Sequence, residues 1–195
     1  MSESYKTISI IPAENIEQST FQLVGTGKFK TPRCNDMTIP IVLTPEMRVN
    51  SIESFQNKIV ISCSTKFKNS FRGMSEWLAS LNDTLLCNTI VEHGDVFLMK
   101  FKVASLQELH ITDMHGEILP TAEEIISLTG KQIVCAIELP CLWQSDTQYG
   151  LTMNLIEAKI LTSAPCLIND DLEDIHADRH TIALDIQPAY VPFEE

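Results

Sequence analysis

The sequence predicts a mainly β protein with one or two short helices, organised as a small Greek-key barrel. Most apolar runs are short, rich in β-branched or aromatic residues, and separated by Gly, Pro, Asn or Asp. Only two segments have a helical pattern, and the second lies just before the last pair of expected strands. The length of 195 residues suits one main domain.

Five or six strands are expected in the body of the chain. They are Thr38–Leu43, Lys58–Ser64, Val96–Ala104, Leu106–Thr112, Gln132–Leu139 and Leu151–Leu161. Between them, Asp113-Met114-His115-Gly116 predicts a turn in which the glycine adopts positive φ, so a hairpin with residues 117–119 follows.

Two segments predict helices. The first is Gly73–Leu86, whose apolar stripe recurs every three or four residues and places Trp77 in the core. The second begins at Thr121, which forms a capping box with Glu124, and ends at Gly130. Strands grouped around such helices fit a barrel of the OB type (a five-stranded Greek-key barrel) better than a parallel α/β sheet.

The net charge of −12 is concentrated at the C-terminus. Residues 166–195 contain eight acidic residues against one base, Arg179, and so carry −7. The remaining 165 residues carry only −5. We therefore expect a body, residues 1–165, followed by an acidic tail, residues 166–195, and the overall acidity does not exclude a polyanionic partner for the body.

The tripeptide Lys-Phe-Lys occurs three times, and these pieces with Arg72 hold half of the fourteen basic residues. On a strand, each copy puts two ammonium groups on one face and a phenyl ring on the other. The plain interpretation is a half-buried surface strand with Phe inside. The functional interpretation is a cationic track for a phosphate backbone, formed by Lys28, Lys30, Lys66, Lys68, Arg72, Lys100 and Lys102.

Aromatic rings for base stacking are expected on loops and strand ends. In the third copy, Phe101 shares a face with Phe97, Met99 and Val103, which predicts that its ring is in the core. The preferred stacking residues are Trp143 and Tyr149, with Phe29 as an addition. The alternative, about equally favoured, is that Trp143 plugs the barrel end and Tyr149 packs beside the turn glycine.

The order of motifs in the C-terminal half resembles the OB-fold single-stranded DNA-binding proteins of phages and large DNA viruses. An apolar strand is followed by Thr112-Asp113-x-x-Gly116, Pro120, Gly130-Lys131, Pro140-x-x-Trp143, Gly150 and the strand Leu155-x-x-x-Lys159-Ile160-Leu161. The acidic stretch and the ending Pro192-Phe193-Glu194-Glu195 match the acidic, aromatic-ended tail of that family. Residues 181–193 depart from it because they are mixed and apolar, which predicts that this part of the tail docks somewhere specific.

The resemblance implies a sequence-nonspecific protein that coats and protects single-stranded DNA during replication and recombination. It also implies that the tail recruits replication proteins such as polymerase or helicase-primase. The tail residues expected to do so are Asp170, Asp171, Glu173, Asp174, Phe193, Glu194 and Glu195. A tethered polyanion would also compete with DNA for the cationic track. A homodimer is compatible with the sequence. The rival function is a viral structural or protein-interaction module with a β-sandwich or barrel core.

Other classes of protein are disfavoured. The sequence contains no phosphate loop, GxSxG or HExxH motif, so no enzyme, catalytic residue or cofactor is expected. The six cysteines form no CxxC pair, which favours reduced thiols in an intracellular compartment, the host cytoplasm or nucleus, over a metal site. No signal sequence and no apolar run of about 20 residues is present, so neither export nor membrane insertion is expected.

Overall fold

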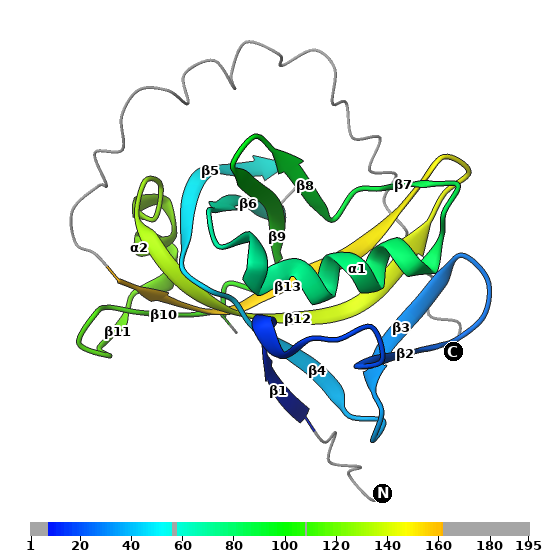
Figure 1. The fold of residues 1–195 in the computed structure, drawn as a ribbon. Coiled ribbons are helices and arrows are strands. Elements are labelled where there is room, and N and C mark those ends of the chain that lie inside the picture. The colour runs from blue at the N-terminus through cyan, green and yellow to red at the C-terminus, as the bar shows by residue number, and fades with distance from the viewer. Residues whose placement is uncertain (1–7, 56–57, 108, 162–195) are drawn as a thin grey trace, which may run out of the picture.

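The computed structural model describes residues 8–55, 58–107 and 109–161 (Figure 1). The predicted acidic tail and its boundary with the body lie outside these residues. The strands are β1 (Ile8–Pro12), β2 (Phe21–Val24), β3 (Phe29–Cys34), β4 (Ile39–Leu43), β5 (Met47–Phe55), β6 (Lys58–Thr65), β7 (Leu86–Cys87), β8 (Ile90–His93), β9 (Val96–Val103), β10 (His110–Thr112), β11 (Ile118–Leu119), β12 (Gln132–Gln144) and β13 (Gln148–Ile160). The helices are α1 (Arg72–Leu81) and α2 (Thr121–Ser127), with 3₁₀ turns at Ala13–Asn15 and Lys68–Phe71.

Five of the described strands close into a ring. β5 pairs antiparallel with β6, and β6 with β9. β9 then meets β13 in parallel, where Lys102 lies opposite Asn154. β13 pairs antiparallel with β12, and β12 returns to β5 through Ile133 opposite Met47. The predicted fold class is confirmed: the protein is mainly β and contains a Greek-key barrel of the OB type.

The two longest strands, β12 and β13, carry the rest of the sheet. The register of this pair shifts after Ala136 and again after Glu138, and such bulges bend a strand. Because β12 is long and bent, its second edge pairs in turn with β5, β4 and β3 (Figure 1). This places β3 beside the far end of β12, away from the strands β6 and β9.

The core follows from the alternation of side chains along the ring strands. On β9, Phe97, Met99, Phe101 and Val103 are buried, while Lys100 and Lys102 point outward, as the sequence predicts. Fully buried neighbours come from facing strands, including Met47, Ile61, Ile133 and Ile137. The outward positions of β6 and β9 are thereby held on a rigid surface.

Helix α1 packs beside β13, with Met74, Trp77 and Leu78 buried (Figure 1). The predicted core position of Trp77 is confirmed, and its ring meets Phe21 edge-on at 4.9 Å between centroids. The helix ends at Leu81 rather than at the predicted Leu86. The reason is the side chain of Asn82, whose Oδ1 accepts hydrogen bonds from the backbone N–H of Thr84 and Leu85 and builds a turn there.

The segment before β12 was predicted in part. The hairpin of β10 and β11 is confirmed, with Gly116 at φ +86° and the Asp113 carboxylate accepting backbone N–H bonds from His115 and Glu117. The strand expected over Leu106–Thr112 is formed only by β10. Helix α2 is capped by Pro120, so Thr121 is its first residue and not the predicted cap. The chain leaves the helix toward Gly130, at φ +82°.

Candidate nucleic-acid interface

The third Lys-Phe-Lys copy lies on β9, and the second directly follows the end of the neighbouring strand β6. In the pairing of β6 with β9, Ser62 lies opposite Lys100 and Val60 opposite Lys102. Residues opposite each other share a face of the sheet, so these positions all lie on the outside of the barrel. Lys58 is near Lys102: burial lowers the pKa of Lys102, and the positive charge of Lys58 lowers it further. Like charges are therefore crowded at this end of β6 and β9.

The ring of the second copy is turned outward, which the strand pattern did not predict. β6 ends at Thr65, and the Thr65 hydroxyl oxygen accepts a hydrogen bond from the backbone N–H of Phe67 at 3.1 Å. The chain therefore leaves the alternating strand geometry before the ring. Phe67 is 52% exposed and Lys66 is exposed, whereas Phe101 of the third copy is fully buried as predicted.

We call Lys58, Lys66, Phe67, Lys100 and Lys102 the outer basic face. Within the described part of the chain, no salt bridge involves any of its four lysines. Their charges are thus not neutralised by described carboxylates and are available to an anion.

Two other predicted cations have acidic partners instead. Lys68 donates from Nζ to the Glu92 carboxylate at 2.5 Å and to the Gly94 carbonyl at 2.6 Å. Its ammonium also lies 5.5 Å from the centre of the Phe97 ring. Arg72 pairs through Nε with Glu76 at 2.8 Å, and this hydrogen bond raises the pKa of the guanidinium. A phosphate would have to compete with both carboxylates at these positions.

The first Lys-Phe-Lys copy lies at the far end of β12. Phe29, at the start of β3, is 50% exposed and lies opposite Trp143, while Lys30 lies opposite the buried Leu142. Lys28 donates to the Asp146 carboxylate at 3.1 Å, and both side chains are exposed. This ion pair connects the turn before β3 to the loop between β12 and β13.

Trp143 lies opposite Gly150 in the pairing of β12 with β13. A Cβ atom added to Gly150 would be 3.0 Å from Cζ2 of the Trp143 indole and 3.0 Å from the Thr89 hydroxyl oxygen. The indole therefore lies directly on the backbone of β13 and is only partly exposed. We call Phe29, Trp143 and Gly150 the aromatic corner.

The aromatic corner and the outer basic face are connected across β12 and β13. Asn154 of β13 lies opposite Lys102, and Cys141 of β12 is close enough that the Lys102 charge lowers the pKa of its thiol against the larger, raising effect of burial. Trp143 is two residues beyond Cys141, and alternate residues of a strand share a face. One side of the sheet thus presents lysines at one end and aromatic rings at the other.

Tyr149 does not belong to this surface. The residue is only 3% exposed, and its hydroxyl donates to the carbonyl of Leu78 in α1 at 2.7 Å. Burial raises the pKa of Tyr149 to about 12. The burial of Tyr149, next to Gly150 in the chain, agrees with the alternative expectation that it packs beside the turn glycine, and it does not support a contact with a base.

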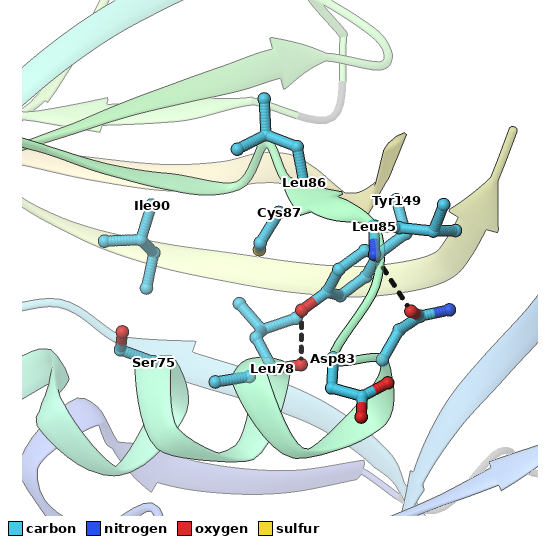
Figure 2. A pocket seen from close by; sticks show the side chains of 10 residues that line it. Ser75, Leu78, Asp83, Leu85, Leu86, Cys87, Ile90 and Tyr149 are labelled. Atoms are coloured by element: carbon cyan, nitrogen blue, oxygen red, sulfur yellow. Dashed lines mark hydrogen bonds between the residues drawn. The ribbon is translucent and has the colours of Figure 1, made fainter. Parts of the chain in front are cut away.

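Tyr149 instead lines a cavity of about 330 Å³ between α1 and the segment that contains β7 (Figure 2). The other lining residues are Ser75, Leu78, Ala79, Asn82, Asp83, Leu85, Leu86, Cys87 and Ile90. The lining offers one carboxylate, from Asp83, and no cation, so it is unsuited to a phosphate.

Sequence reasoning missed Lys58 and the exposure of Phe67. Lys58 could have been found because it begins a strand whose alternate residues face outward. Phe67 gave no such signal, because the end of β6 is set by the Thr65 side chain. Tail residues predicted to bind partners lie outside the described residues.

Nothing in the described residues forms a group of three or more His, Cys, Asp or Glu side chains that could hold a metal ion. The described cysteines are all free thiols. The described helices include none that is both long and apolar enough to cross a membrane.

No protein-family model matches the sequence, and no curated protein does. Among solved structures, the chain is similar to the single-stranded DNA-binding protein from bacteriophage Enc34, with 12% identity and a TM-score of 0.49 over 80% of this chain and 99% of that one. A C-terminal truncation of that protein is similar at 8% identity and a TM-score of 0.49, over 74% of this chain and 96% of that one. The same phage protein in complex with single-stranded DNA is similar at 9% identity and a TM-score of 0.47, over 75% of this chain and 98% of that one.

Proposed function

We propose that the protein binds single-stranded DNA, without sequence preference, on the outer basic face and the aromatic corner. The observation that carries this proposal is the register of β6 and β9, which sets Lys100 and Lys102 outward beside β6, whose end at Thr65 is followed directly by the exposed Lys66 and Phe67. β6 and β9 are the second and third strands of the barrel ring. In OB folds the face of the second and third strands binds oligonucleotides. By analogy, the proposed site lies on the face that other OB folds use for binding.

The two kinds of side chain have separate roles in this proposal. Lys58, Lys66, Lys100 and Lys102 neutralise phosphates and release counterions, which gives affinity without reading sequence. Phe67 and the aromatic corner offer ring faces to unpaired bases, and every base has such a face to stack. Bases in a duplex are already stacked and paired, so the rings favour single strands.

The cellular role follows from the same chemistry. A protein of this kind coats and protects single-stranded DNA during replication and recombination, and no catalytic step is part of the proposal. The tail, residues 166–195, carries −7 and would recruit replication proteins with basic surfaces, including polymerase or helicase-primase. The compartment proposed is intracellular and reducing, which suits six cysteines without a CxxC pair.

The test is a titration of fluorescent oligo-dT at several salt concentrations, with duplex DNA as the competitor control. Lys100→Gln with Lys102→Gln should weaken binding and lower the salt slope by roughly 1.4, since each lost phosphate contact on a single strand removes about 0.7. The matched control is Lys131→Gln with Lys159→Gln, which removes the same charge next to α2 and β10. Equal effects of the two double variants would contradict the assigned face and favour nonspecific attraction.

A further inference from the structure

The outward side of β1 and β4 is an apolar surface without a described cover. Ile8 is 53% exposed and Ile10 is 64% exposed, and they lie opposite Ile39 and Ile41 in the parallel pairing with β4. Leu43, at the end of β4, is 40% exposed. Large apolar side chains gathered on neighbouring strands mark an interaction surface more often than isolated ones do.

β1 also has an open edge. Among the described strands it pairs only with β4, so one row of its backbone N–H and C=O groups has no strand beside it. Exposed edges with apolar side chains recruit another extended segment, whose backbone supplies the missing hydrogen bonds. The occupant should therefore be an extended segment with alternating apolar residues.

The sequence contains such a segment outside the described residues. In Thr181-Ile182-Ala183-Leu184-Asp185-Ile186 the large apolar residues alternate with small or polar ones. On an extended segment, Ile182, Leu184 and Ile186 would share one face. This is the part of the tail whose apolar character the acidic, partner-recruiting role does not explain.

The connection is long enough to reach. β13 ends at Ile160, opposite Ile133, and β4 pairs with β12 a few residues further along. β12, β4 and β1 separate β13 from a strand added at the free edge of β1, so the distance across is about 20 Å at about 5 Å per strand. The linker of about 20 residues between Leu161 and Ile182 has a root-mean-square length of about 25 Å as a flexible chain, so the local concentration is in the millimolar range.

We propose that residues 181–186 add as a strand to the free edge of β1, with Ile182, Leu184 and Ile186 beside Ile8 and Ile10. A second copy of the chain is the weaker occupant. β1 has only five residues, and two such strands bury far less than the roughly 1,200 Å² of a stable interface. Docking places the acidic stretch around residues 170–174 in the loop between β13 and the docked segment.

The experiment is hydrogen exchange by mass spectrometry on the full-length protein, read at residues 8–12. In Leu184→Asp, a charge replaces the central apolar contact, and exchange in β1 should be roughly tenfold faster than in the unaltered protein. Val191→Asp makes the same charge change in the same tail but outside the segment, and should leave exchange in β1 unchanged. Ile10→Asp should speed exchange at residues 181–186, and its exposed position keeps the core intact.

Two results would overturn the proposal. One is equal exchange at residues 8–12 in the unaltered protein, in Leu184→Asp and in Val191→Asp. The other is protection of β1 that increases with protein concentration, which would assign the surface to a second copy. Neither result bears on DNA binding, so the proposed function is tested separately.

Discussion

The indole of Trp143 rests on Gly150, the residue opposite it on β13, so closely that a Cβ atom added there would be 3.0 Å from Cζ2 and the indole would have to shift. We predict that Gly150→Ala destabilises the protein by about 1 to 3 kcal/mol, the usual cost of overpacking. The displaced indole should also weaken oligo-dT binding. Urea unfolding followed by circular dichroism measures the first effect. Thr152→Ala, at the next outward position of β13, is the control, and equal stability of the two variants would contradict the close contact.

Phe67 and Phe101 are the central residues of two Lys-Phe-Lys copies, but Phe67 is exposed and Phe101 is fully buried. Phe67→Ala should reduce the affinity for oligo-dT by about 1 to 3 kcal/mol, because a stacking ring is lost. Its melting temperature should change little, since the ring is exposed. Phe101→Ala should instead lower the free energy of unfolding by about 3 to 5 kcal/mol. Paired thermal melts and binding titrations separate the two, and unchanged binding by folded Phe67→Ala would remove the ring from the site.

Glu92 forms an ion pair with Lys68, so its carboxylate would compete with a phosphate for this ammonium group. Glu92→Gln should therefore tighten oligo-dT binding and steepen its salt dependence by up to about 0.7, the value of one added contact. The Glu92 side chain is 65% exposed and Lys68 keeps its hydrogen bond to the Gly94 carbonyl, so stability should change by only about 1 kcal/mol. Glu117→Gln, in the turn between β10 and β11, makes the same change in net charge. If it tightens binding equally, the effect comes from overall charge and Lys68 makes no contact.

The phenol of Tyr149 should lose its proton at a higher pH than an ordinary tyrosine. Burial raises its pKa from 10.0 to about 12, so between these values the folded protein keeps a proton that the unfolded chain has lost. The free energy of unfolding should consequently fall as the pH rises from 10 to 12, and Tyr149→Phe should reduce that fall. Tyrosinate absorbance and urea unfolding over this range test the assignment. The same pH dependence in Tyr149→Phe would show that another group is responsible.

The sequence pattern predicted the parts of the fold in which buried residues recur regularly, at every second position of a strand or every third to fourth position of a helix. The alternation along β9 placed Phe101 inside and Lys100 outside, and the helical stripe placed Trp77 in the core. Patterns failed where one side chain redirects the backbone, as Asn82 does after α1 and Thr65 after β6. They also missed edge strands such as β1, which is too short to show a period.

The candidate site was predicted in its residue types more than in its geometry. Lys100 and Lys102 lie outward on β9, whereas Phe29 lies at the far end of β12, and the contact of all three with DNA stays a prediction. For Tyr149 the sequence left packing and base contact about equally favoured, because the hydrogen bond to Leu78 that accompanies its burial joins residues far apart in the sequence. The acidic partners of Lys68 and Arg72 likewise come from tertiary contacts or helical spacing that the tripeptide pattern does not include.

The ring of strands constrains how the chain is made as well as what it binds. Its last two closures join β9 to β13 and β5 to β12, strands that are far apart in the sequence. During synthesis, the N-terminal strands must wait with unpaired edges until β13 has left the ribosome. Such late, long-range closure slows folding and exposes strand edges to other chains. A chain truncated before residue 148 would lack β13, so its ring of strands would stay open and its unpaired edges would favour aggregation.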